Sequence, residues 1–291
     1  MRRRRQVALA VGGALVLLLV GVTQFLPQLI DRALGARDIP PPQMEVTPVA
    51  TPEAFPHSLL DAVLQEHVTP AGTVDYGKLG ADARLGRYVA HLARYSPASH
   101  PKLFPTRAHE LAYWCNAYNA LVLYGVTKHW PIASVRDVQV DAWVSAGEGQ
   151  GFFYALKFTL GGQRINLYDL ENKTIRGYGD ARIHAAINCA SLGCPVLDRH
   201  AFMPDTLDAH FDRLMRSMVA EDRNLTVDHG ARTLRASAIF DWFAEDFGDP
   251  LAYWISFSDP AGKAELERAR DGAYSIEFVD YDWGINLLGS R

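Results

Sequence analysis

The chain is poor in cysteine and lacks several common functional signatures. Only three of its 291 residues are cysteine. We find no internal repeat, no glycine-rich phosphate loop and no dinucleotide-binding fingerprint. The formal net charge is -4, and no stretch of Lys and Arg alternates with aromatic residues, which argues against a nucleic-acid-binding protein. No cofactor is therefore expected, and the few cysteines become the residues to explain.

The N-terminus has the pattern of a membrane anchor. Four arginines, Arg2 to Arg5, precede a nearly unbroken apolar run over residues 7–26. About 20 apolar residues in a helix span roughly 30 Å, the thickness of a bilayer core. We expect residues 1–6 to form a cytoplasmic tail and residues 7–26 a single transmembrane helix, with the rest of the chain in a bacterial periplasm.

A cleavable signal peptide is the alternative reading of the same segment. Its apolar core would be shorter, and a cleavage site of small residues would follow closely. The nearest candidate here, Ala33-Leu34-Gly35, lies well beyond the apolar run. The spacing therefore favours an uncleaved anchor.

Beyond the apolar run, the composition predicts a linker followed by one domain. Residues 27–56 are rich in proline and are expected to be semi-extended and to build no core. Residues 57–291 have the length of a single domain. Helical periodicity, strongest over residues 106–128, and a hairpin pattern over residues 152–167 predict an α+β fold, with many helices around a small antiparallel sheet.

Two of the three cysteines lie close to a histidine, in the segment from Arg182 to Leu197. The apolar residues from Ile183 to Ile187 predict a short buried strand that contains His184. Glycine and proline then break regular structure near Cys189 and Cys194. A strand that leads a thiol into a tight turn is a common way to present a nucleophile.

Three interpretations of this segment stay open. His184 and one cysteine could form a thiolate–imidazole pair, because a thiol needs a cationic neighbour or a helix dipole to ionise at neutral pH. Cys189 and Cys194 could instead form a disulfide, which an oxidising periplasm favours. A zinc site with His200 matches none of the usual ligand spacings, so no metal is expected. His184 alone could also be a buried, hydrogen-bonded histidine.

Polar residues on apolar elements are the remaining candidates. Asn116 and Asn119 are three positions apart on the long helix and share one face, so they either brace backbone or line a site. Glu171 lies among apolar residues and either orients His184 or is a solvated surface charge. Glu110 is a further carboxylate on the long helix.

These residues and their order resemble the DUF547 family, a domain named for its unknown function. The resemblance runs from about His67 to Leu287 and is carried by the following motifs: Val74-Asp75-Tyr76, Ala112 to Ala120, Trp130-Pro131-Ile132, Ser134 to Asp137, Leu170-Glu171-Asn172, Ile175-Arg176, Arg182 to Leu197, Ser237 to Phe247 and Tyr281-Asp282-Trp283. It implies a compact α+β domain similar to papain-like or transglutaminase-like thiol enzymes, with a Cys–His–carboxylate site.

In the family pattern, Cys189 corresponds to the first cysteine and His184 to the histidine. Glu171 corresponds to the glutamate of an Ile-Glu-His element, but Asn172 stands where that element usually has its histidine. Because this chain lacks that second histidine, any role that the family pattern assigns to it is in doubt here. Cys194 remains an alternate nucleophile, a resolving thiol or a disulfide partner.

The leading hypothesis is a membrane-anchored, periplasmic thiol hydrolase or transferase acting on peptide, amide or thioester bonds. Cys189 attacks a carbonyl, His184 moves the proton and Glu171 orients the imidazole. Glu110 or an aspartate from the C-terminal third could orient it instead. The backbone N–H of Cys189, with the side chain of Asn116 or Asn119, would form the oxyanion hole.

The expected substrate is a peptide or a small γ-glutamyl or thiol compound, so the enzyme could be an acyl or γ-glutamyl transferase. The runner-up hypothesis is non-enzymatic: a binding or scaffold domain of the cell envelope, stabilised by a disulfide between Cys189 and Cys194. The membrane would be contacted through the N-terminal helix, and no nucleic-acid partner is expected.

Overall fold

The computed structural model describes residue 26 and residues 28–143 and 150–290. The expected cytoplasmic tail, residues 1–6, and all of the expected transmembrane segment except Leu26 lie outside these described residues. Within the described part of the chain, no helix is both long and apolar enough to span a bilayer.

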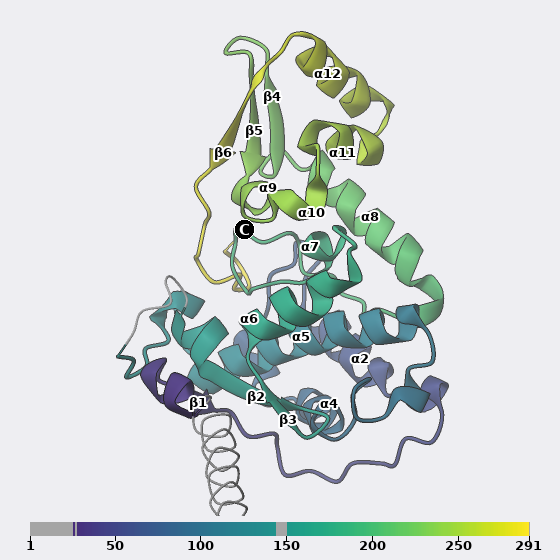
Figure 1. The fold of residues 1–291 in the computed structure, drawn as a ribbon, viewed down its shortest axis with the longest axis vertical. Helices are drawn as coiled ribbons and strands as arrows, with labels where there is room; N and C mark the ends of the chain where they lie inside the picture. Colours follow the sequence, from purple (N-terminus) through teal and green to yellow (C-terminus); the bar gives the residue numbers. More distant parts are fainter. Residues whose placement is uncertain (1–25, 27, 144–149, 291) are drawn as a thin grey trace, which may run out of the picture.

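The fold is α+β and rich in helices (Figure 1). The helices are α2 (His57–His67), α3 (Tyr76–Leu79), α4 (Ala83–Arg94), α5 (Arg107–His129), α6 (Leu167–Asp169), α7 (Ile183–Ala186), α8 (Leu207–Ala220), α9 (Ala238–Trp242), α10 (Ala244–Phe247), α11 (Pro250–Phe257) and α12 (Pro260–Asp271). Short helical turns are η1 (Pro52–Ala54), η2 (Pro101–Leu103), η3 (Val135–Asp137), η4 (Gln150–Ala155), η5 (Leu170–Ile175), η6 (Arg176–Tyr178) and η7 (Pro204–Thr206).

Two small mixed sheets take the place of the one antiparallel sheet expected from the sequence. Their strands are β1 (Arg37–Asp38), β2 (Leu156–Leu160), β3 (Gln163–Ile165), β4 (Leu225–Asp228), β5 (Thr233–Ser237) and β6 (Ser275–Val279). The sheets have the orders β1-β2-β3 and β4-β5-β6, and each combines one antiparallel and one parallel pair. Figure 1 shows them toward opposite ends of the molecule, with α7 between them.

Helix α5 is the centre of the core, as its sequence predicts. Thr106 caps its N-terminus by accepting a hydrogen bond from the backbone N–H of His109. Every residue from Leu111 to Val126 is buried. A helix that is apolar on all sides can be stable only when other elements surround it, and here helices pack around it (Figure 1).

The hairpin of β2 and β3 also agrees with its sequence pattern. Gly161 and Gly162 form the turn with φ values of 54° and 80°, a region that residues with a side chain rarely adopt. A Cβ on Gly161 would lie 2.1 Å from the hydroxyl oxygen of Ser96. The glycine pair is therefore required both by backbone conformation and by close packing.

The proline-rich segment before α2 packs against the domain, which differs from the expected free linker. Arg37 and Asp38 pair in parallel with β2. Ile39 and Phe55 are buried at 8% and 6% exposure and belong to the core. Phe55 contacts the aromatic ring of Tyr113 on α5 edge-on. Proline prevents regular structure in this segment, but it does not prevent the apolar residues between the prolines from packing.

The segment expected to be a strand before Cys189 is mostly a helix. Residues Ile183–Ala186 form α7, and only Ile187 is extended, with φ -94° and ψ 142°. A short, continuous apolar run is compatible with a buried strand and with a buried helix, because both are surrounded by apolar groups. The prediction of a strand is therefore wrong, although its burial is confirmed.

The C-terminal segment returns to the cysteine loop after β6. Leu192 and Gly193 donate backbone hydrogen bonds to the carbonyl oxygens of Gly284 and Asp282, at 2.7 and 2.8 Å. Asn286 donates a third to the carbonyl oxygen of Ala190 at 3.0 Å. This pairing attaches the last part of the chain to the loop that carries both cysteines.

The packed proline-rich segment leads to a stability prediction. Phe55→Ala should lower the free energy of unfolding by about 3–5 kcal/mol, because a buried aromatic side chain is replaced by a cavity. Phe278→Ala, at a side chain that is 41% exposed, is the control and should change it by about 0.5 kcal/mol or less. Urea unfolding of both variants is the measurement. Equal stability of Phe55→Ala and the parent protein would contradict the packing of this segment.

Candidate active site

Cys189 and His184 line the same open cleft. Its volume is about 560 Å³. Half of the lining residues are aromatic, and the polar ones include both loop cysteines, His184, Glu171 and Arg176. The complete lining comprises Tyr118, Phe153, Tyr154, Tyr168, Glu171, Asn172, Arg176, His184, Ile187, Cys189, Cys194, Ile239, Trp242, Phe243, Tyr281 and Trp283. A concave site with a few convergent polar groups is the usual form of a ligand-binding or catalytic pocket.

Asn188 shapes the loop that carries the cysteines. Its side chain accepts a hydrogen bond from the backbone N–H of Ala190 at 2.8 Å and donates one to the carbonyl oxygen of Pro195 at 2.8 Å. Ala190 has a positive φ of 65°, which is uncommon for a residue with a side chain. The buried amide therefore closes the turn and compensates for the unfavourable backbone conformation between the two thiols.

The two loop cysteines are thiols that share one tyrosine. The Tyr281 hydroxyl oxygen lies 2.9 Å from the Cys189 sulfur and 3.0 Å from the Cys194 sulfur, so its one proton can be donated to either sulfur, but to only one at a time. The backbone N–H of Cys189, expected to be an oxyanion donor, donates to the Cys194 sulfur at 3.0 Å. Tyr281 thus connects the end of the chain directly to both sulfurs.

The polar groups around Cys189 favour its thiolate. Burial raises the pKa of Cys189, but hydrogen bonds from Cys194, Ser191 and Tyr281 outweigh burial and lower this pKa overall. Burial raises the pKa of Cys194, and the neighbouring Cys189 raises it further. When one of the two sulfurs ionises, it is therefore Cys189, with Cys194 as a hydrogen-bond donor to it.

His184 is paired with Asp246, on α10. Its Nε2 lies 2.7 Å from a carboxylate oxygen of Asp246, so we assign the ring proton to Nε2. One face of the imidazole stacks on Phe243 at 4.0 Å between ring centroids. Burial lowers the pKa of His184 to about 4, more than the Asp246 carboxylate raises it. The ring is consequently neutral at neutral pH, with Nδ1 as its proton acceptor.

Arg176 fixes the position of the Asp246 carboxylate. Its guanidinium donates to both carboxylate oxygens, at 2.6 and 2.9 Å, and to the side-chain oxygen of Asn172 at 2.9 Å. Burial raises the pKa of Asp246, but the hydrogen bonds from Arg176 and His184 outweigh burial and lower it overall. Asp246 is therefore ionised and held rigidly behind the imidazole.

Glu171 occupies a different place from the one expected for it. It lines the cleft and accepts a hydrogen bond from the Tyr118 hydroxyl at 3.2 Å, whereas Asp246 is the carboxylate that contacts His184. Burial, with a contribution from the charge on Cys189, raises the pKa of Glu171 to about 7. The alternate carboxylate, Glu110, accepts a 2.6 Å hydrogen bond from the Tyr178 hydroxyl.

Asn116 and Asn119 both bind backbone groups. Asn116 donates to the carbonyl oxygen of Phe202 at 2.8 Å and accepts from the Phe202 N–H at 2.9 Å. Asn119 donates to the carbonyl oxygen of Ala186 at 2.9 Å and accepts from the Asn188 N–H at 2.9 Å. Asn119 therefore braces the chain just before Cys189, and neither amide is part of the cleft lining.

Sequence reasoning missed Tyr281, and it allowed an aspartate from the C-terminal third as the partner of His184 without identifying Asp246. Asp246 and Tyr281 both lie within motifs that carry the DUF547 resemblance, but nothing in the sequence connects them to His184 and Cys189. A carboxylate in an aromatic helix and a tyrosine near the C-terminus have many structural roles. Only the folded chain brings Tyr281 to the cleft and Asp246 to His184.

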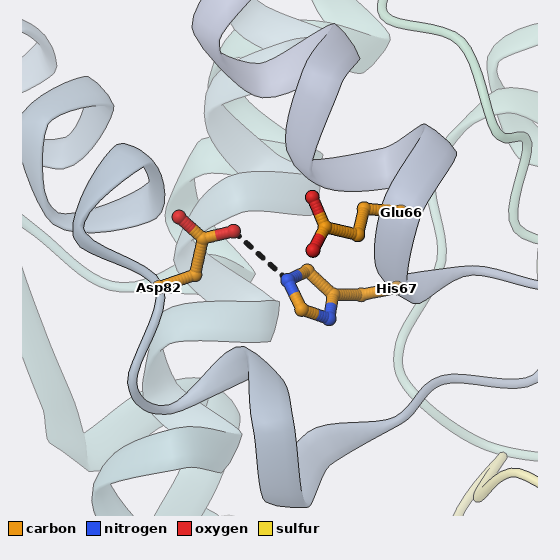
Figure 2. A group of neighbouring side chains, drawn as sticks. All are labelled: Glu66, His67 and Asp82. Atoms are coloured by element: carbon orange, nitrogen blue, oxygen red, sulfur yellow. Dashed lines mark hydrogen bonds and ion pairs between the residues drawn. The ribbon is translucent and has the colours of Figure 1, made fainter.

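A second group of titratable side chains lies on α2 and before α4 (Figure 2). Figure 2 shows Glu66, His67 and Asp82 converging, and their possible ligand atoms lie within 4.8 Å of one another. His67 Nε2 is 2.8 Å from a carboxylate oxygen of Asp82. The Arg84 guanidinium pairs with both carboxylates. Because one guanidinium already pairs with both carboxylates, we interpret this group as an ion-pair network, and we assign no metal to it.

Comparison with known protein families confirms the family resemblance. Residues 103–219 match the family model described as "Protein of unknown function, DUF547". The matched segment includes α5, Glu171 and the cysteine loop. No curated protein and no solved structure matches the chain.

The shared tyrosine leads to a prediction about thiol reactivity. Tyr281→Phe removes a donor to the Cys189 thiolate, which is worth about 1.5–3 kcal/mol for a charged acceptor and should raise the pKa of Cys189 by about one or more. At any pH below the pKa of Cys189 in the parent protein, a smaller fraction of this thiol is then ionised in Tyr281→Phe than in the parent. The pH profile of iodoacetamide alkylation at Cys189, followed by peptide mapping, should therefore move to higher pH.

Tyr168→Phe is the matched control, because Tyr168 lines the same cleft and stacks on Tyr154. Its alkylation profile should coincide with that of the parent protein. Coincident profiles for Tyr281→Phe and the parent would show that the hydroxyl does not stabilise the thiolate.

Proposed function

We propose that this chain is a thiol hydrolase or acyl transferase that acts on peptide, amide or thioester bonds, with Cys189 as nucleophile. The observation that carries the proposal is the Cys189 sulfur in an open cleft, hydrogen-bonded to Tyr281, with His184, the partner of Asp246, lining the same cleft. A thiol with a lowered pKa and a histidine oriented by a carboxylate are the components of nucleophilic thiol catalysis. A likeness to papain-like or transglutaminase-like enzymes is part of the same proposal.

In this mechanism the Cys189 thiolate attacks the substrate carbonyl carbon. The bond to the leaving group breaks, the leaving group takes the proton that the Cys189 thiol gave to Nδ1 of His184 when it ionised, and a thioester to Cys189 remains. Water or an acceptor nucleophile then attacks the thioester, and the thiol is released. Each half of the reaction needs one proton transferred, and general acid–base catalysis of such a transfer typically contributes about 10²–10⁴-fold.

His184 supplies the proton acceptor. Asp246 accepts from Nε2–H and so leaves Nδ1 unprotonated. Asp246 therefore takes the orienting role that the sequence assigned to Glu171. No hydrogen bond joins the described side chains of Cys189 and His184, whose partners here are Tyr281 and Asp246. Catalytic hydrogen bonds commonly tighten only in the substrate complex, so we assign this proton transfer to the complex.

We also propose that the enzyme is anchored in a bacterial inner membrane and faces the periplasm. The support is the sequence alone: the arginines before an apolar run of bilayer length over residues 7–26. An amide- or thioester-cleaving enzyme in that location would act on envelope peptides or acylated compounds.

One observation favours the non-enzymatic alternative, a scaffold domain with a disulfide. Cys189 and Cys194 both contact the same hydroxyl and are close to each other in the loop. A structural disulfide would require their sulfurs to approach to about 2.05 Å. The oxidation state of protein from the periplasm is therefore the quantity that separates the two functions.

The experiment is to trap the acyl-enzyme. The reduced protein, mixed with an activated thioester, should gain the mass of one acyl group at Cys189, and Cys189→Ala should gain none. Cys189→Ala should also lower the hydrolysis rate by about 10³-fold or more, because the covalent route is lost.

Cys115→Ala is the matched control, because Cys115 is a fully buried thiol on α5 that does not line the cleft. It should be acylated as fast as the parent protein. A protein that is never acylated, and whose Cys189 and Cys194 are quantitatively bridged when it is isolated without reductant, would contradict the enzyme and support the scaffold.

A further inference from the structure

Two stacked pairs of aromatic side chains line the cleft. In one pair, Tyr154 and Tyr168 stack at 4.2 Å between ring centroids, with 21° between ring planes. In the other, Trp242 and Trp283 stack at 5.9 Å and 25°, and Tyr281 contacts both. Tyr168 and Trp242 are 37% and 48% exposed, so broad apolar surface continues out to solvent.

The charged groups of the cleft already have partners. Among the described lining residues, the one guanidinium, that of Arg176, donates to both oxygens of Asp246. His184 donates to the same carboxylate. Glu171 accepts from the Tyr118 hydroxyl, and its burial disfavours the anionic form. The lining thus offers no uncommitted cation to a substrate anion.

A cleft lined by aromatic surface and by charged groups that already have partners should distinguish substrates by their charge. A charged group buried without a partner is strongly unfavourable, so a ligand carboxylate facing Glu171 would bind poorly. A γ-glutamyl group carries both an α-carboxylate and an α-ammonium, and each would need a partner of opposite charge. Apolar rings and alkyl chains, in contrast, gain free energy by covering aromatic surface.

We infer that the acyl group transferred to Cys189 is uncharged and apolar, an aryl- or long-alkyl-bearing group that lies between the Tyr154–Tyr168 and Trp242–Trp283 pairs. This inference rests on the proposed thiol mechanism and deepens it by naming the substrate class. It excludes the γ-glutamyl compounds that the sequence left open.

The covalent step is the same for every member of this class. The Cys189 sulfur forms a bond to the carbonyl carbon, and the carbonyl bond to the leaving nitrogen or sulfur breaks. The leaving group departs with the proton that His184 took from the Cys189 thiol, and hydrolysis transfers a proton of water to the sulfur and releases a carboxylic acid. At neutral pH this acid ionises to a carboxylate, and a cleft without a free cation would also favour release of the anion.

The test compares three amides with one leaving group, 4-nitroaniline. The acyl groups are N-acetyl-phenylalanyl (uncharged and aromatic), γ-glutamyl (with both charges) and N-acetyl-lysyl (cationic). We expect kcat/KM for the aromatic substrate to exceed the other two by about tenfold or more, a ratio that a matched apolar pocket commonly reaches. Equal or greater kcat/KM for the γ-glutamyl or the lysyl substrate would overturn the inference.

A substitution in the Trp242–Trp283 pair tests where the acyl group binds. Trp242→Ala should raise KM for the aromatic substrate about five- to tenfold and change kcat little, because the side chain contacts the acyl group and not the reacting atoms. Phe278→Ala is the control: it removes an aromatic side chain of similar exposure on β6, outside the cleft lining. An unchanged KM in Trp242→Ala would contradict the assignment.

Calorimetric binding to Cys189→Ala separates this inference from the mechanism. This variant cannot be acylated, so N-acetyl-phenylalaninamide and γ-glutamylamide can be compared as simple ligands. Tighter binding of the aromatic amide supports the substrate class even where no acyl-enzyme forms in the parent protein. Equal binding of the two amides, with normal acylation of Cys189, overturns the substrate class and leaves the thiol mechanism in place.

Discussion

The contact between the Tyr281 hydroxyl and the two loop sulfurs is the interaction on which this account depends. It joins residues that are far apart in the sequence, at 2.9 Å to Cys189 and 3.0 Å to Cys194. Backbone hydrogen bonds from Leu192 and Gly193 to the segment after Tyr281 hold the two pieces in register. The C-terminal segment therefore completes the site as well as the fold.

The electrostatics of the cleft follow from a competition between burial and hydrogen bonding. For Cys189 and Asp246, hydrogen bonds outweigh burial and the charged forms are favoured. For His184 and Glu171, burial dominates and the neutral forms are favoured. The site therefore has one ionisable sulfur, one neutral imidazole and one ionised carboxylate, that of Asp246. Glu171 adds a carboxyl group with a pKa of about 7. The proposed mechanism uses this sulfur as the nucleophile and this imidazole as the proton acceptor.

Much of the local structure could be predicted from the sequence. The apolar pattern of residues 106–128 identified α5, and the Gly161-Gly162 pair identified the hairpin of β2 and β3, because periodicity and turn chemistry act locally. The α+β class and the DUF547 resemblance were predicted correctly as well. His184 and Cys189 were singled out from the clustering of histidine and cysteine in one segment and from the DUF547 resemblance, and the structure places both on the cleft.

The remaining features depend on tertiary contacts that no local pattern encodes. Burial on all sides made α7 look like a strand, and proline content concealed the packing of Phe55. Asp246 replaced Glu171 beside His184 because the docking of α10 against α7, and not sequence proximity, determines the partner of the imidazole. Asn119 was expected to brace backbone or to line a site, and its two hydrogen bonds show the bracing role.

The most direct test of the central claim is an ultraviolet titration of the thiolate. The absorbance of the reduced parent protein minus that of Cys189→Ala isolates the ionisation of Cys189 as the pH is raised. We expect the midpoint of this difference to lie below the value of about 8.5 for a free thiol. A midpoint at or above that value, in folded and reduced protein, would contradict an activated nucleophile in this cleft.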